Sequence, residues 1–289
     1  MDTFFSYARG SYVQTEQLAL PFMDDILGTL RGYRIFTAAR TVRGKVFHLD
    51  DHVNRLFDSA AEIYMEMPHT KEELKRVVEE TVAKNNRETS GDLFVEILFS
   101  GGPADAIGVL PIGPAHLYII VFPLKPRPES FYRDGISLAA YQYERQFPSV
   151  KLLNYVGGVI ANQTVVKQHN AQDALFVSVS PPHYILEGTT FNFSLVSDGV
   201  LYTHPFDGAV LHGITLDITL KLAREKNILV KRERLPYEAL RSADEAFITS
   251  VGRNIIPVIR VDDIVIGKGA PGAMTRSLMK AFEEYVAQY

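Results

Sequence analysis

Lys151 is the residue of this 289-residue chain whose surroundings point most directly to chemistry. It lies near the start of an apolar stretch, PSVKLLNYVGGVI, which covers residues 148–160. Burial of an ammonium group is costly and lowers the pKa of a lysine. A neutral amine in a dry site is the nucleophile that Schiff-base formation needs. The alternative is an amphipathic helix start whose lysine extends to the surface, and this stretch alone leaves both interpretations open.

Two segments have the composition of anion-binding sites. Gly213-Ile214-Thr215 stands at the start of a predicted helix, and helix N-termini with a preceding glycine bind phosphate groups. Ser250-Val251-Gly252 follows a predicted strand and offers backbone N–H groups for the same kind of ligand. Taken separately, the first segment is also consistent with an ordinary helix cap and the second with a plain loop.

Glu187 is the third candidate, in the segment LEGTTFN between two predicted strands. A carboxylate there would pair with a pyridinium nitrogen and keep the ring protonated, so that the ring withdraws electrons. A solvent-facing turn glutamate is the competing interpretation. A lysine, an anion site and a carboxylate together are the components of a pyridoxal phosphate site.

Composition and missing motifs exclude several other classes. The chain is 46% apolar and 22% charged with a net charge of -4, which is typical of globular proteins and unfavourable for nucleic-acid binding. It has no cysteine, no glycine-rich nucleotide motif and no H-E-x-x-H, so we expect no disulfide and no metal. Without a leader-like segment or a membrane-length apolar run, we expect a cytoplasmic protein with no membrane partner.

Helices and strands alternate along the whole chain, which predicts a mixed α/β (α+β) fold. The proline-rich stretch PLKPRPES suggests a linker at 123–130, between a small domain (1–122) and a larger domain (131–289). We expect helices from Asp50 to about residue 65, after Thr70 with a capping box, from Lys151 to about residue 169, at 214–227, at 237–243 and from about Gly272. The expected strands cover residues 33–42, 45–49, 92–99, 116–122, 136–141, 174–179, 191–196, 200–204, 228–234, 245–250 and 254–261.

Five segments in order resemble the class IV (fold type IV) aminotransferases, which include D-amino-acid and branched-chain aminotransferases and aminodeoxychorismate lyase. The segments are HLDDHVNRL (48–56), KLLNY (151–155), LEGTTFNFS (186–194), LHGIT (211–215) and ITSVGRNIIPV (248–258). Each is weak alone, but their order and spacing cover nearly the whole chain. The resemblance implies a two-domain fold type IV architecture with pyridoxal 5′-phosphate between the domains, and a homodimer in which the partner completes each active site.

The resemblance also implies roles for individual residues. Lys151 would form the Schiff base and carry the proton, Arg55 would bind the cofactor phosphate, and Glu187 would pair with the pyridine nitrogen. An amino acid would then give up its amino group and leave as a 2-oxo acid, and a second oxo acid would reverse the sequence. The other implied cofactor contacts are Tyr155, Ile214, Thr215, Ser250 and Val251.

Two substrate-binding patterns that are usual in this family are missing. D-amino-acid aminotransferases usually carry an R-G-x-x-x-R-x-H-like pattern after strand 92–99, where this chain has SGGPADAIG. Branched-chain enzymes usually have an aromatic-x-arginine within that strand, where this chain has Phe94-Val95-Glu96. The SGG stretch and LRGYRIF resemble an atypical branch of D-amino-acid aminotransferases that uses an arginine near the first active-site strand. The expected substrate-binding residues are Arg31, Arg34, Arg40, Tyr33 and Gly252.

The expected reaction is amino transfer between D-amino acids, such as D-alanine or D-glutamate, and 2-oxoglutarate or pyruvate. An L-branched-chain or an (R)-amine aminotransferase is the nearest alternative, since a pocket without the usual arginines would accept amines that carry no carboxylate. Aminodeoxychorismate lyase would use the same lysine for elimination. A non-catalytic protein of the same fold is the alternative from another class, although Lys151 and Glu187 argue against it.

Overall fold

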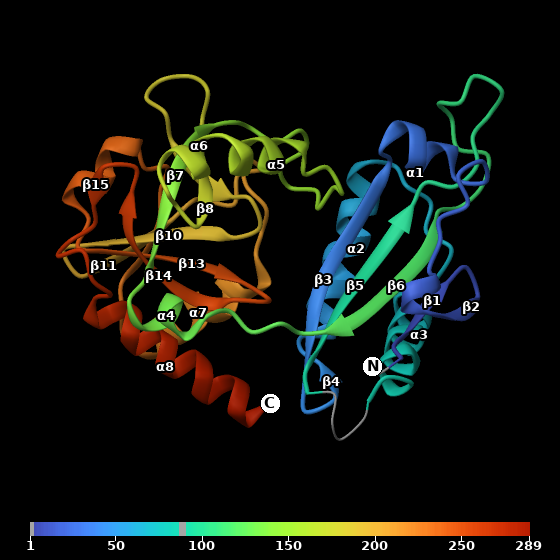
Figure 1. Ribbon diagram of the computed structural model, residues 1–289, viewed down its shortest axis with the longest axis horizontal. Coiled ribbons are helices and arrows are strands. Elements are labelled where there is room, and N and C mark those ends of the chain that lie inside the picture. Colours follow the sequence, from blue (N-terminus) through green and yellow to red (C-terminus); the bar gives the residue numbers. More distant parts are fainter. Residues whose placement is uncertain (1–2, 87–90) are drawn as a thin grey trace. The chain divides into compact units, whose positions relative to one another are not determined.

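The computed structural model describes residues 3–86 and 91–289, and the chain forms two compact units (Figure 1). The first unit contains Met1–Lys125 and also Val150–Asn154, and the second contains Pro126–Ser149 and Tyr155–Tyr289. The main division falls within the proline-rich stretch at 123–130. The sequence pattern gave no sign that Val150–Asn154 packs with the first unit. These five residues lie inside a longer apolar run, and nothing in their composition sets them apart.

The first unit is built on a six-stranded sheet with the order β2-β1-β6-β5-β3-β4, in which all the neighbouring strands are antiparallel. Its strands are β1 (Phe5–Ala8), β2 (Ser11–Gln14), β3 (Arg34–Val42), β4 (Lys45–Val46), β5 (Leu93–Ser100) and β6 (His116–Pro123). Its helices are η1 (Thr15–Gln17), α1 (Ile26–Arg31), α2 (Leu49–Glu62) and α3 (Lys71–Ala83).

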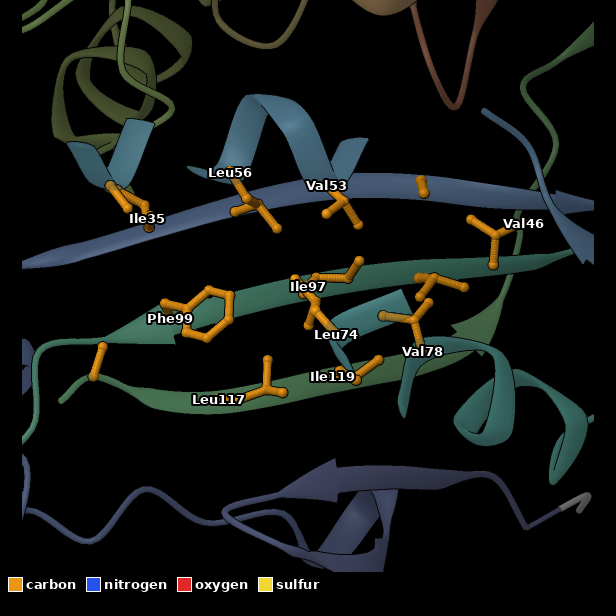
Figure 2. Close-up of a cluster of buried hydrophobic side chains, with 14 of the residues drawn as sticks. Ile35, Val46, Val53, Leu56, Leu74, Val78, Ile97, Phe99, Leu117 and Ile119 are labelled. Atoms are coloured by element: carbon orange, nitrogen blue, oxygen red, sulfur yellow. The ribbon is translucent and has the colours of Figure 1, made fainter. Parts of the chain in front are cut away.

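Alternate residues of β3, β5 and β6 supply one buried apolar face of this sheet, as the two-residue period of a strand requires. Helices α2 and α3 add Leu56 and Leu74 to the same cluster, and Figure 2 shows these side chains together with Ile97 and Ile119 of the strands. Burial of these apolar side chains fixes the register of the strands, because a slip by one residue would move every one of them to the opposite face.

The opposite face of the sheet carries the residues between those of the core. Register pairing places Arg34 beside Ser100 and His116, Phe36 beside Leu98 and Tyr118, and Ala38 beside Glu96 and Ile120. Polar and charged side chains therefore lie among aromatic ones on this face.

Helix α3 confirms the expected capping box, since Thr70 Oγ1 accepts from the Glu73 N–H and Glu73 accepts from the Thr70 N–H. The expected strand at 45–49 is shorter, because α2 already begins at Leu49. The prediction that Asp50 starts this helix is therefore wrong: its N-cap is His48, which has a left-handed backbone with φ 55°, and Asp50 lies in the first turn.

The segment around Lys151 is extended, so the expected helix from Lys151 to residue 169 is wrong at its start. Leu152 forms a bridge with Ile35, and the Lys151 carbonyl accepts a hydrogen bond from the Phe36 N–H at 3.0 Å. Helix α5 (Val156–Gln163) begins five residues later and is followed by α6 (Val165–Gln168). The apolar run at 148–160 thus contains a strand-like part beside β3 and a separate helix start.

The second unit contains a nine-stranded sheet in which one path closes on itself. The path runs β10-β13-β14-β7-β8-β9, and the pairing of Asn192 with Glu187 joins β9 back to β10. The strands are β7 (Ile136–Gln142), β8 (Asp173–Val177), β9 (Ile185–Gly188), β10 (Asn192–Ser197), β11 (Val200–Thr203), β12 (Val230–Arg232), β13 (Glu245–Ser250), β14 (Asn254–Val261) and β15 (Ile264–Val265). Glu187 therefore lies where this path closes.

Helices surround the second sheet, with α7 and α8 packed against β13 and α8 also against β14. Besides α5 and α6, they are α4 (Glu129–Arg133), α7 (Ile214–Glu225), η2 (Tyr237–Ser242) and α8 (Ala273–Gln288) (Figure 1). Among residues 3–86 and 91–289, no helix is long and apolar enough to cross a membrane, and no group of acidic or histidine side chains is arranged to hold a metal ion.

Candidate active site

Lys151 is held beside β3 in the first unit by backbone hydrogen bonds. Besides the bond from Phe36, its own N–H donates to Ser59 Oγ of α2 at 3.4 Å. The ammonium lies 4.8 Å from the centre of the Phe36 ring, which is the geometry of a cation–π contact. The backbone of Lys151 is therefore fixed beside β3, and its side chain lies against the Phe36 ring.

Arg55 lies on α2, one turn before Ser59, and donates a hydrogen bond from Nη2 to Thr37 Oγ1 at 2.6 Å. The same hydroxyl lies 2.8 Å from Nδ1 of His52. Burial, and then the charges of Arg55 and Lys151, hold the pKa of His52 well below its ordinary value of 6.5. His52 is therefore neutral at pH 7, and both cations lie within electrostatic range of its ring.

Glu96 brings a carboxyl group to the sheet face opposite the apolar core. Burial raises the pKa of Glu96, and the charge of Lys151 acts in the opposite direction. Its neighbours across the sheet, Ala38 and Ile120, offer no charge to compensate it.

Glu187 is buried in the second unit, and donors contact both of its carboxylate oxygens. Its Oε1 accepts from Nε of Arg145 at 2.8 Å, and its Oε2 accepts from the Leu211 N–H at 3.2 Å. Arg145 also donates to the carbonyls of Gly188 and Thr189, and its guanidinium lies 5.1 Å from the centre of the Tyr155 ring. This arginine thus joins two predicted site residues, Glu187 and Tyr155, and stabilises the carboxylate form of Glu187.

The N-terminus of α7 confirms the expected helix start at Ile214. In the described chain no side chain caps this helix, and Gly213 stands at the N-cap position with an extended backbone. A Cβ at Gly213 would collide with Asn192 Oδ1, and Asn192 Nδ2 donates to the Leu211 carbonyl at 2.8 Å. Asn192 thus fixes the approach to a helix whose first N–H groups, with Thr215, are suited to an anion.

The loop that holds Ser250, Val251 and Gly252 connects β13 to β14, and Arg253 anchors it. Arg253 pairs with Asp173 at 2.8 Å and donates to Thr190 Oγ1 at 3.0 Å. Asp173 in turn accepts from Thr189 Oγ1 at 2.6 Å. The loop is therefore fastened to the same 187–190 segment that Arg145 holds from its other side.

The structure does not bring the three candidate substrate arginines together. Arg34 and Arg40 are six residues apart on β3, or about 20 Å along the strand. Arg34 pairs with the fully buried Asp25 at 2.9 Å and donates to Ser100 at 2.7 Å, whereas the guanidinium of Arg40 lies 5.5 Å from the Phe47 ring centre. Arg31 is exposed, and both of its hydrogen bonds within the described residues go to carbonyls, of Gly108 and Leu30.

Tyr33 and Gly252, the other two expected substrate residues, lie in different surroundings. The Tyr33 hydroxyl donates to the Ile63 carbonyl at the end of α2, at 2.8 Å, and its ring packs on the first core. Gly252 lies in the β13–β14 turn. The geometry of Tyr33 is that of a packing residue of the first unit.

A comparison with protein families matches residues 34–261 to the amino-transferase class IV family. The chain belongs to this family. A Methanocaldococcus jannaschii protein, assigned only provisionally as a branched-chain-amino-acid aminotransferase, is 33% identical over 285 residues, or 96% of this chain and 95% of its own length. A D-alanine aminotransferase of Staphylococcus haemolyticus is 29% identical over 282 residues, or 97% of each chain.

Solved structures confirm the fold type expected from the sequence. The branched-chain amino acid aminotransferase of Escherichia coli superposes with a TM-score of 0.88 at 27% identity, covering 98% of this chain and 94% of that one. A second branched-chain amino acid aminotransferase, from the organism abbreviated T.th. and crystallised with pyridoxamine 5′-phosphate, gives a TM-score of 0.89 at 26% identity, covering 100% and 95%. The named relatives are therefore divided between branched-chain and D-alanine aminotransferases.

Class IV aminotransferases use pyridoxal phosphate, and the residues of this chain fit that group. The N-terminus of α7, where a side chain at position 213 would collide with Asn192, suits a phosphate. In the first unit Arg55 would add a cation, and in the second unit Glu187 offers a buried carboxylate that Arg145 and the Leu211 N–H hold in place. Lys151, in the first unit, would supply the amine.

Several residues of this constellation escaped the sequence analysis. His52 lies inside the HLDDHVNRL segment, where the three-residue spacing to Arg55 on one helix was an available signal. Thr37 lies next to Phe36 in a predicted strand, but nothing local marks it. Arg145 and Arg253 lie in loops and act across the sheet, so only tertiary structure identifies them.

Proposed function

We propose that this chain transfers amino groups between D-amino acids, such as D-alanine or D-glutamate, and 2-oxo acids such as 2-oxoglutarate or pyruvate. The observation that carries the choice is Glu96, which stands on β5 where the branched-chain pattern has an arginine. Position 96 therefore lacks the cation with which the branched-chain pattern would bind a substrate carboxylate. The D-alanine aminotransferases among the relatives support the same choice.

Pyridoxal phosphate supplies, when bound, an electron-withdrawing ring that stabilises negative charge at the substrate α-carbon. Lys151 would hold the cofactor covalently, and its freed Nζ would carry the proton that the substrate α-carbon gives up. Arg145 keeps Glu187 ionised, and the carboxylate would accept a hydrogen bond from the protonated ring nitrogen. Arg55 and the first turn of α7, with Ile214 and Thr215, bind the phosphate, and Ser250 and Val251 complete that set.

Arg31 is our choice for the residue that binds the substrate carboxylate. A carboxylate clamp needs a cation that is not already neutralised, and Asp25 neutralises Arg34 in a buried pair. Arg31 instead lies against the Gly108 carbonyl of the loop that follows β5. Arg40 is the second choice, on the same sheet face as Glu96.

Substitution of Arg31 and of Arg34 distinguishes substrate binding from a purely structural ion pair. Arg31→Gln should raise the KM for amino acids by about 10- to 100-fold, the usual effect of losing a hydrogen bond to a charged group, and leave the KM for a simple amine unchanged. Arg34→Gln is the matched control, since it should lower stability rather than affect KM selectively, because Asp25 would stay buried without its partner. An unchanged amino-acid KM for Arg31→Gln would transfer the role to Arg40 or to another residue.

An (R)-amine aminotransferase is the second candidate, and Glu96 favours it as well. A subsite that contains a carboxyl group would accept a donor that carries no carboxylate of its own. Initial rates with D-alanine, L-leucine and (R)-1-phenylethylamine, all with 2-oxoglutarate as the acceptor and the last two also with pyruvate, distinguish the candidates. We expect the highest kcat/KM with D-alanine, whereas preference for L-leucine would overturn the proposal in favour of a branched-chain enzyme.

We also propose that the chain acts as a homodimer. Helix α5 exposes Val156, Val159 and Ile160, and the loop after β5 exposes Ile107 and Leu110. Each of these two groups of exposed apolar side chains is typical of a surface that binds a partner. Light scattering after gel filtration should give twice the mass of the 32.4 kDa chain, and a monomeric mass would contradict the proposal.

A further inference from the structure

Thr37 joins two functional side chains in the interior of the first unit. It lies on β3, is fully buried, and meets α2 through its hydroxyl group. Arg55 Nη2 donates to Thr37 Oγ1 at 2.6 Å, and His52 Nδ1 lies 2.8 Å from the same oxygen. Both partners belong to α2, one turn apart, so a single hydroxyl fixes both side chains of one helix face.

The protons of this triad have one consistent arrangement. A guanidinium only donates, so Thr37 Oγ1 accepts from Arg55. The hydroxyl proton then needs an acceptor, and within the described residues only His52 Nδ1 lies at hydrogen-bond distance. Burial and the neighbouring cations keep the imidazole neutral, so Nδ1 has a lone pair and the ring proton is on Nε2.

We propose that Thr37 is a positioning residue for the cofactor phosphate, whose hydroxyl accepts from Arg55 and donates to His52 and thereby fixes the Arg55 guanidinium in its binding orientation. The inference rests on the proposed role of Arg55. An arginine side chain has many rotamers, and a ligand that must order it loses affinity. The hydrogen bond to Thr37 orders the guanidinium before the phosphate binds, so binding does not have to pay that conformational entropy. The bond occupies one of the five N–H donors of the guanidinium.

Thr37 itself is too deeply buried to bind substrate, and a methyl group would fill its space equally well. Thr37→Val therefore removes the hydroxyl with little change in volume, although a valine leaves His52 and Arg55 without their shared partner. Thr37→Ser keeps the hydroxyl and is the conservative control. Thr37→Ala tests the same loss should the valine variant fail to fold.

The test compares pyridoxal phosphate with pyridoxal, which lacks the phosphate group. Each full-length variant is freed of cofactor and titrated with either compound, and the visible absorbance gives the two Kd values. For Thr37→Val we expect the Kd of pyridoxal phosphate to rise by about ten-fold, as for a lost hydrogen bond to a charged group, and the Kd of pyridoxal to stay within about two-fold. Thr37→Ser should restore the wild-type ratio.

Equal weakening of both compounds by Thr37→Val and Thr37→Ala would overturn the inference, because it would indicate a general structural effect. An unchanged Kd for pyridoxal phosphate would overturn it as well. Neither result would contradict the proposed function, provided that the wild-type chain binds pyridoxal phosphate through Lys151. A wild-type chain that binds neither compound would instead refute the proposed function and this inference together.

Discussion

Arg145 lies at the centre of the contacts that hold Glu187. It pairs with the carboxylate of Glu187, which is almost fully buried. It also donates hydrogen bonds to the carbonyls of Gly188 and Thr189. Removal of one member of such a pair leaves an uncompensated charge in the interior.

Arg145→Met should therefore lower the free energy of unfolding by about 3 kcal/mol. In the double variant with Glu187→Gln the loss should be smaller than the sum of the two single losses, because no charge is then left buried. Urea unfolding of the four proteins measures this coupling. Additive losses would show that the pair contributes nothing through its charges.

His52 should make stability depend on pH. Its folded-state pKa lies below its ordinary value, so the unfolded chain binds the extra proton in the range between the two. The free energy of unfolding should thus fall as the pH drops from about 7 to about 5, by at most about 1.4 kcal/mol per pH unit from this group. The same series on His52→Gln should be flatter, and an equally steep decline would assign the effect to other groups.

At the level of single residues, the sequence singled out candidate chemical groups but not the side chains that orient them. Lys151 and Glu187 stood out because an amine and a carboxylate are unusual in apolar segments. Thr37 and Arg145 hold side chains that are distant in the sequence. The folded chain brings these partners together, and no local sequence pattern shows it. Tyr33 was expected near the substrate, but its hydroxyl is bonded to the Ile63 carbonyl.

The start of α7 is the element whose shape most constrains the proposed phosphate site. Gly213 leaves room for Asn192, whose side chain holds the chain just before the helix. Gly213→Ala should force Asn192 to move and should lower the free energy of unfolding by about 2 kcal/mol, with weaker cofactor binding. Thermal unfolding and cofactor titration measure the two effects.

Gly113→Ala is the matched control for that substitution. A Cβ there would meet only Pro103 Cγ, at an ordinary contact distance of 3.9 Å, so stability should change little. If Gly213→Ala behaves like Gly113→Ala, the close approach of Asn192 does not constrain the helix start.

The elements that were predicted well are those with a local signal. Helix α3 has its capping box, and β5 and β6 have long apolar alternation. Helix α2 begins at a left-handed His48, which no capping rule anticipates, and the strand-like segment at Lys151 is stabilised by β3, more than a hundred residues away. Tertiary contacts override local preference in both cases.

At the scale of the whole molecule, membership of the class IV aminotransferases defines the reaction class but not the substrate. Relatives of nearly equal identity carry names from two substrate classes. The physical reason is that one fold can hold a common set of catalytic groups, whereas specificity depends on a few side chains, for which we propose Arg31 and Glu96 in this chain.

The most direct test of the account is the visible absorption spectrum of the purified wild-type chain and of Lys151→Ala, each with pyridoxal phosphate and then with D-alanine. We predict that the wild-type chain shows the band of lysine-bound cofactor and loses it when D-alanine is added. Lys151→Ala should lack that band and should transfer no amino group to a 2-oxo acid. A Lys151→Ala chain that retained wild-type transaminase activity would contradict the account at its centre.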